Sequence, residues 1–254
     1  MNPKRSYQTL LWIPSMIARG IFLVLIGGIL LSRCLPVRAR ADTPFLSETE
    51  DRGAHYIDSL VFFGESTTTH LRARGVLTGG SDTHQVWSDQ SGTKMLSSRI
   101  TSEPIVYPET GELLTIAEAC ARKHPSTLVL SFGLNGAVRF ANDTELYIRC
   151  YEKLIDAIIE SSPETKIIIQ TVYPVRRADA YSVDVNTLNG YLMQLNAALP
   201  TLAEHHGQAR IVDTASVLRD EKGYLREELA EPDGIHLNTN AYREILAYLR
   251  THAW

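Results

Sequence analysis

Three short motifs contain residue types that together could perform nucleophilic catalysis. They are Gly64-Glu65-Ser66, Gly133-Leu134-Asn135-Gly136 and Asp233-Gly234-Ile235-His236. A serine hydroxyl is a weak nucleophile until a base takes its proton, and histidine suits that role near neutral pH. A carboxylate must hold the imidazole in the correct tautomer and stabilise its charged form. We therefore predict Ser66 as the nucleophile, His236 as the general base and Asp233 as the residue that orients it.

Each motif taken alone also has a purely structural explanation. Ser66 could cap a helix, Asn135 could occupy a glycine-rich turn, and Asp233 with His236 could be solvated loop residues. Their combination favours catalysis because all three motifs fall at the same edge of the sheet that the sequence predicts. Among the other histidines, His70 could line the site, and three lie at helix ends or in connections: His124, His205 and His206.

An alternation of apolar strands and helices must position these motifs. Strands are predicted at residues 57–63, 127–132, 165–171 and 210–213, and helices at residues 66–74, 116–123, 142–161, 185–205 and 239–252. The third helix has Asn142 or Asp143 near its N-cap, and Pro200 could kink the fourth. This alternation indicates an α/β fold, a three-layer α/β/α sandwich with a central parallel sheet. In such sheets the chemistry lies just beyond the carboxyl ends of the strands.

The order serine, asparagine, then aspartate with histidine resembles that of the SGNH hydrolases, also called GDSL-like lipases and esterases. The resemblance covers roughly residues 57–252 and implies their flavodoxin-like fold. It departs from the family pattern at Glu65, where aspartate is usual and the change looks tolerable, and at Gly136, which replaces an aspartate. It implies an oxyanion hole made by the Ser66 N–H, the Asn135 side chain and a second glycine. We assign that glycine as Gly92, with Gly79 and Gly80 as rivals.

The resemblance implies a serine ester hydrolase that works through an acyl-enzyme and needs no cofactor or metal. The expected substrate is a small-molecule or glycan ester carrying an O-acetyl or other short acyl group. We predict Trp87, Tyr173 and Arg176 as substrate-binding residues, with Arg177 as an alternative to Arg176. The long loop at residues 75–111 is expected to form part of the substrate wall.

Three other functions share these residues. An O-acyltransferase would use the same triad and pass the acyl group to a sugar. A catalytically decayed SGNH domain would only bind glycans. A flavodoxin-like binding module would cradle phosphate on the helix that begins with Ser66-Thr67-Thr68-Thr69, but it leaves Asp233 and His236 without a purpose.

Charge and hydropathy divide the chain of 254 residues into unequal parts. The first 41 residues hold six of the 25 basic residues and none of the 29 acidic ones, so the remainder has a formal net charge of −10. So acidic a body is a poor match for nucleic acid or an anionic membrane surface. We predict a signal peptide or N-terminal membrane anchor at residues 1–41, a spacer at 42–55 and the SGNH hydrolase domain at 56–254.

The N-terminal segment predicts an extracytoplasmic protein, either secreted or membrane-anchored. It combines a basic start, an uncharged run at residues 20–31 and a small-x-small pattern at Ala39-Arg40-Ala41. Any contact with a membrane is expected only through this segment. Export would permit Cys120 and Cys150 to pair, although buried free thiols fit the pattern equally well. The oligomeric state stays open.

Overall fold

The computed structural model describes residues 43–254, which form one compact unit. The segment predicted as a signal peptide or anchor lies outside the described residues. Five parallel strands form the central sheet in the order β2-β1-β5-β6-β7. Their bounds are Val86–Trp87 (β2), Leu60–Gly64 (β1), Thr127–Ser131 (β5), Lys166–Gln170 (β6) and Ala209–Val212 (β7).

The strands are central because nearly all their side chains are apolar and buried on both faces. All five residues of β1 are buried, and so are the first four of β5. Leu60 pairs with Thr127 and Gly64 with Ser131, so β1 and β5 end at the same level. The segments that follow these two strands therefore leave the sheet side by side.

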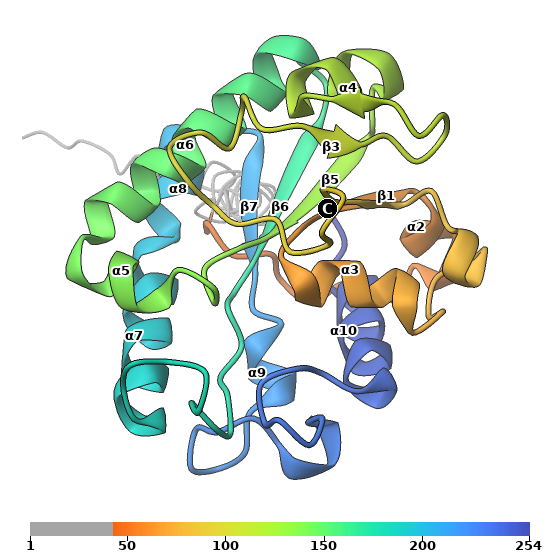
Figure 1. The fold of residues 1–254 in the computed structure, drawn as a ribbon. Coiled ribbons are helices and arrows are strands. Elements are labelled where there is room, and N and C mark those ends of the chain that lie inside the picture. Colours follow the sequence, from red (N-terminus) through yellow and green to blue (C-terminus); the bar gives the residue numbers. More distant parts are fainter. Residues whose placement is uncertain (1–42) are drawn as a thin grey trace, which may run out of the picture. The chain divides into compact units, whose positions relative to one another are not determined.

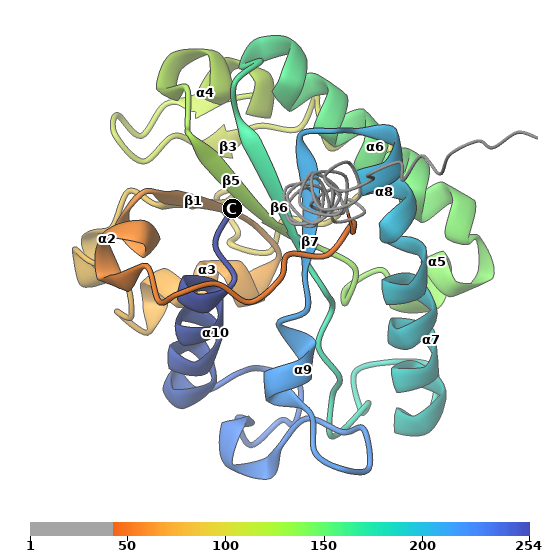
Figure 2. The ribbon, with the colours of Figure 1, turned by 180° about the vertical axis from the view of Figure 1, so that it is seen from behind.

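Helices cover both faces of the sheet (Figures 1 and 2). One layer contains α2 (Gly53–Asp58), α3 (Ser66–Ala73), α9 (Ala215–Leu218) and α10 (Thr239–Thr251). The other contains α4 (Ile116–Lys123), α5 (Ala137–Asn142), α6 (Thr144–Ser161), α7 (Val185–Ala198) and α8 (Pro200–His205). The predicted three-layer α/β/α sandwich is confirmed.

Short elements occupy the long connections. Residues 75–111 contain a 3-10 turn, η1 (Gly80–Asp82), the edge strand β2 and the first strand of a two-stranded antiparallel sheet. That small sheet pairs β3 (Ile105–Val106) with β4 (Leu113–Leu114). A second 3-10 turn, η2 (Glu227–Leu229), precedes α10.

One predicted strand begins later than expected, and one predicted helix is divided at the proline that was expected to kink it. The expected strand at residues 57–63 begins only at Leu60, because residues 57 and 58 complete α2, whose buried Ile57 packs into the core. The expected helix at 185–205 is two helices, since Pro200 starts α8 after α7 has ended at Ala198. Proline is well tolerated in the first turn of a helix but not in its interior.

The segment expected as a spacer is bonded to the body of the molecule. Phe45 forms a parallel bridge with Ile211 of β7, and the N–H of Thr49 donates to the Thr251 carbonyl at 2.6 Å. Cys120 and Cys150 are both buried, free thiols, and burial raises the pKa of Cys120 to about 12. Among residues 43–254, no helix is long and apolar enough to cross a bilayer.

Candidate active site

The nucleophile turn, residues 64–66, connects β1 to α3. Glu65 occupies the N-cap position of α3 without a side-chain capping bond, and Ser66 is the first helical residue. The Ser66 hydroxyl oxygen lies 3.4 Å from Nε2 of His236. Ser66 therefore does not serve as the helix cap, and its backbone N–H belongs to the first turn, where a helix leaves such groups unpaired.

The histidine turn, residues 233–236, brings the other two predicted catalytic residues to Ser66. Nδ1 of His236 lies 2.6 Å from Oδ2 of Asp233. The other carboxylate oxygen accepts the N–H groups of Ile235 and His236, each at 2.9 Å. Burial raises the pKa of Asp233, but the hydrogen bonds from His236 and Ile235 outweigh it and lower that pKa to about 2. Asp233 is therefore an anion at neutral pH, as an orienting carboxylate must be.

Residues of the segment after β6 hold the histidine turn in place. The Tyr173 hydroxyl donates to the Ile235 carbonyl at 3.1 Å, and the Arg176 N–H donates to the Gly234 carbonyl at 2.7 Å. Gly234 has a φ of +69°, and a Cβ there would lie 2.6 Å from Cγ of Arg177. Glycine is thus required by both the backbone conformation and the packed arginine.

The carboxylate of Glu65 fixes the asparagine loop, residues 132–136. Its oxygens accept the N–H of Gly133 at 3.0 Å and that of Asn135 at 3.1 Å. Glu65 is only 2% exposed, and this burial raises its pKa to about 7 despite the opposing hydrogen bonds from the loop. Within residues 43–254, no hydrogen bond engages the Asn135 side-chain amide, which leaves its N–H₂ group for a ligand.

Two tyrosines of α6 form hydrogen bonds with the backbone of the same loop. The hydroxyls of Tyr147 and Tyr151 donate to the Phe132 carbonyl at 3.0 and 3.3 Å, and the Phe132 N–H donates to the Tyr151 hydroxyl oxygen at 3.1 Å. Sequence reasoning missed both residues and the role of Glu65. Their spacing of four residues, which puts both hydroxyls on one helix face, was the available signal.

Gly92 lies beside α3, but its amide is engaged. Its carbonyl accepts the Thr69 hydroxyl at 2.9 Å, and its N–H donates to the Asp89 carbonyl at 3.1 Å. A third oxyanion donor at Gly92 would require this bond to Asp89 to open. The rivals Gly79 and Gly80 come after the C-terminal end of α3, which lies about 10 Å along the helix from Ser66 at 1.5 Å per residue.

Two of the predicted substrate-binding residues serve the protein core instead. Trp87 is 0% exposed and packs near Tyr107, so its burial does not fit the predicted role as a substrate wall. Tyr173 is 6% exposed and its hydroxyl is bonded to Ile235, which makes it a support of the histidine turn rather than a substrate contact.

The third, Arg176, is half-buried and paired. Its guanidinium donates to the Leu225 carbonyl at 3.0 Å and to the Asp220 carboxylate at 3.2 Å. Arg177 is more exposed and bonds Asp179 at 2.8 Å. Among the described residues, no group of three or more histidine, cysteine, aspartate or glutamate side chains is arranged to hold a metal ion.

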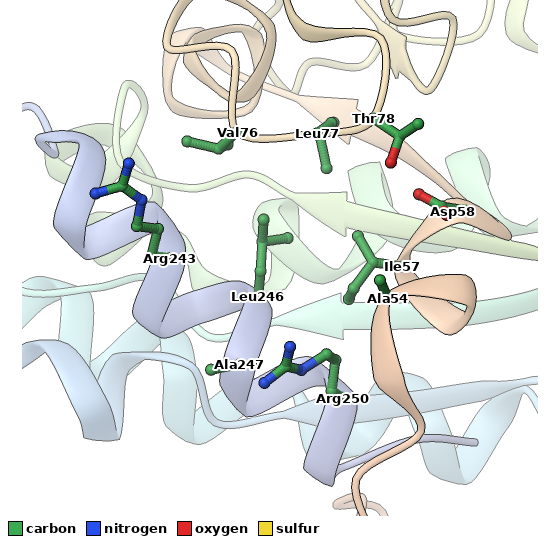
Figure 3. Close-up of a pocket in the computed structure, with 10 residues that line it drawn as sticks. All are labelled: Ala54, Ile57, Asp58, Val76, Leu77, Thr78, Arg243, Leu246, Ala247 and Arg250. Carbon is green, nitrogen blue, oxygen red and sulfur yellow. The ribbon is translucent and has the colours of Figure 1, made fainter.

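A separate cavity of about 370 Å³ lies between α2, the segment after α3 and α10 (Figure 3). Apolar side chains form its floor, and two arginines of α10, Arg243 and Arg250, stand along one side. Arg250 is bound to Asp51 at 3.1 Å. No member of the triad lines this cavity, so it is distinct from the site at Ser66.

The fold and the site define the class of protein. A flavodoxin-like parallel sheet that carries serine, asparagine and an aspartate–histidine pair at its carboxyl edge is the arrangement of SGNH hydrolases. The model of the GDSL-like lipase/acylhydrolase family matches residues 62–244, and the chain belongs to this family. It is therefore a carboxylic ester hydrolase.

Two solved structures share the fold at low sequence identity, and a third is a weaker match. A Bacteroides fragilis protein assigned as an acylhydrolase is 16% identical, with a TM-score of 0.51 over 82% of this chain and 88% of that one. A Desulfitobacterium hafniense protein of the G-D-S-L family is 13% identical, with a TM-score of 0.50 over 76% and 98%. A family 3 carbohydrate esterase from Talaromyces cellulolyticus is 14% identical, with a TM-score of 0.47 over 75% and 93%. No curated protein matches the chain.

Proposed function

We propose that this chain is an exported serine esterase that removes O-acetyl or other short acyl groups, with a glycan as the preferred alcohol. The observation that carries the proposal is the continuous chain from Ser66 through His236 to Asp233, with separations of 3.4 and 2.6 Å. A decayed site would have no need to keep this chain. Its geometry therefore supports catalysis over simple glycan binding.

The reaction proceeds in two acyl transfers. Nε2 of His236 takes the Ser66 proton as Oγ attacks the ester carbonyl carbon, and the carbonyl oxygen becomes an anion. The Ser66 N–H and the Asn135 side-chain N–H₂ donate to that anion. The tetrahedral intermediate collapses, and His236 gives its proton to the departing alcohol. Water then repeats the sequence on the acyl-serine and releases the carboxylic acid.

The exposure of the proposed triad supports a bulky polar alcohol. The side chains of His236 and Asp233 are 34% and 47% exposed, so the catalytic residues lie at the surface, where a polymer can reach them. Export is supported by the sequence of residues 1–41 alone, through its basic start and uncharged run.

Labelling with a fluorophosphonate tests the nucleophile without assuming a substrate. The full chain, kept in mild detergent, should gain the mass of one adduct. Ser66→Ala should gain none, whereas Ser102→Ala, which removes an exposed serine of the long loop, should label like the parent. No adduct on the folded parent would refute the proposed triad.

Acetylated glycans then test the substrate class. Release of acetate that depends on Ser66 would support the esterase. Movement of the acetyl group to an added sugar in preference to water would instead assign the O-acyltransferase function, because both reactions share the acyl-enzyme.

A further inference from the structure

His70 lies beside the triad, yet the mechanism above gives it no role. It follows Ser66 by four residues on α3, so both side chains lie on the same helix face. Its ring centroid is 5.0 Å from that of His236, with the two ring planes tilted by 46°. The two imidazoles are therefore in contact, so the His70 ring restricts the His236 ring on that side.

The surroundings of His70 favour its neutral form. Burial has the largest effect and lowers its pKa, and the neighbouring His236 and Arg74 lower it further, while the carboxylates of Glu231 and Asp233 act in the opposite direction. Arg74 directly follows α3, and the other three of these titratable groups belong to residues 231–236. Nδ1 of His70 is buried and has no hydrogen-bond partner among residues 43–254.

The charge of this ring matters for the proposed reaction. His236 becomes an imidazolium when it takes the Ser66 proton, and a positive charge 5.0 Å away would oppose that step. A neutral ring imposes no such penalty and still fills the space beside His236. The side chain at position 70 must therefore be a ring that fills the space beside His236 and must carry no charge that opposes protonation of His236.

We infer that His70 is a positioning residue, whose neutral ring packs against His236 and keeps that imidazole directed at the Ser66 hydroxyl. The inference rests on the proposed triad. It assigns to His70 an effect on turnover without any contact with the substrate.

Three substitutions at this position separate ring shape from charge. His70→Phe keeps an uncharged ring and should stay within about threefold of the parent in kcat. His70→Ala removes the ring and should lower kcat by about tenfold with KM unchanged, because misplacement of a catalytic group slows chemistry rather than binding. His70→Lys places a cation beside His236 and should lower kcat on the order of a hundredfold.

The assay uses p-nitrophenyl acetate hydrolysis and the rate of fluorophosphonate labelling, with thermal melting measured for every variant. His206→Phe is the matched control, since His206 also has a buried ring nitrogen without a partner but lies at the end of α8. It should leave both rates unchanged. Parent-like kcat in His70→Ala and His70→Lys would overturn the inference, as would equal losses in His70→Phe and His70→Ala.

An NMR titration of the His236 Cε1–H proton keeps this test separate from that of the proposed function. Absence of labelling in the parent would refute the triad mechanism. The ring contact is still measurable in that case: the His236 resonance should shift in His70→Ala and not in His206→Phe. An unchanged His236 resonance in His70→Ala would overturn the inference. The spectra can be recorded at low temperature, so the test also applies if this variant is too unstable for the kinetic assay.

Discussion

The nucleophile turn and the histidine turn meet at the Ser66 hydroxyl, but different kinds of bond hold them. On the nucleophile side a single buried carboxylate, that of Glu65, joins residues 64–66 to the asparagine loop through two N–H groups. On the histidine side the bonds are spread among several residues, including Tyr173, Arg176 and the ion pair of Arg74 with Glu231. Several of these partners are partly exposed.

This difference predicts how substitutions on each side of the site affect stability and turnover. At Glu65 one side chain carries two opposing contributions to stability. Desolvation disfavours its charged form, while its two hydrogen bonds fix the asparagine loop. On the histidine side several weaker bonds stabilise the turn together, so removing any one of them should lower stability and kcat only slightly. Substitutions on the two sides should therefore differ in size and in the property they change.

The largest effect is expected at Asn135, where a substitution should lower kcat strongly and leave the free energy of unfolding nearly unchanged. Asn135→Ala removes the side-chain donor but keeps the backbone N–H that binds Glu65. Loss of one oxyanion donor typically costs on the order of 10²- to 10³-fold in kcat, whereas the free energy of unfolding should change by less than about 0.5 kcal/mol. Steady-state kinetics and urea denaturation check the two halves of this prediction.

Asn135→Asp is the matched variant, because it keeps the size of the side chain but replaces the donor by a carboxylate. It should be at least as slow as Asn135→Ala, since a negative charge repels the developing oxyanion. Turnover of Asn135→Ala within twofold of the parent would remove Asn135 from the oxyanion hole.

The next effect concerns the pH dependence of stability, through Glu65. Its pKa is about 7 in the folded protein against an ordinary value of 4.5. Between these values the folded state keeps a proton that the unfolded state has lost, so this carboxyl makes stability fall as pH rises. The difference of about 2.5 pKa units corresponds to about 3 kcal/mol, lost between pH 4.5 and 7 and constant above.

Urea denaturation of the parent and of Glu65→Gln between pH 4.5 and 8 measures this contribution. The stability difference, parent minus Glu65→Gln, should decrease as pH rises through the window and then level off. Glu145→Gln, which changes a side chain that is 89% exposed, should give a difference independent of pH. A parent-minus-Glu65→Gln difference that rises with pH would show that the loop stabilises the charged form instead.

Glu65 also shows how far the sequence could be interpreted. The parallel sheet, and the three motifs that follow its strands, could be predicted from local patterns: apolar runs and the turns that end them. The aspartate-to-glutamate departure at position 65 looked tolerable because that residue is outside the triad. Its bonds to Gly133 and Asn135 join positions about 70 residues apart, and no local pattern reveals such a pairing.

Trp87 and Tyr173 show that the burial of a side chain is equally hard to predict from the sequence. Both were predicted to contact the substrate, and both are aromatic residues of a kind that often lines binding sites. Trp87 is buried beside Tyr107, and Tyr173 is buried with its hydroxyl bonded to the Ile235 carbonyl. Those are tertiary contacts, set by chain segments distant in the sequence.

A smaller effect is expected on the histidine side, at Tyr173. Tyr173→Phe leaves the Ile235 carbonyl without its donor, which should lower the free energy of unfolding by about 1 kcal/mol and slow kcat severalfold by loosening the turn. Tyr242→Phe is the matched control, because the Tyr242 hydroxyl is buried without a hydrogen-bond partner among residues 43–254. It should be neutral or stabilising. Equal losses in both variants would mean that the Ile235 bond contributes nothing specific.

The smallest effect is expected at Arg74, whose guanidinium lies 2.6 Å from the Glu231 carboxylate. The two side chains are 33% and 25% exposed, so water and salt screen the pair, and such pairs typically contribute less than about 1 kcal/mol. Arg74→Ala should therefore change stability by less than Tyr173→Phe does, and by still less in 1 M NaCl, with kcat within about twofold. A tenfold loss of kcat would show that this ion pair is the main support of the histidine turn, and each side of the site would then depend chiefly on one charged contact.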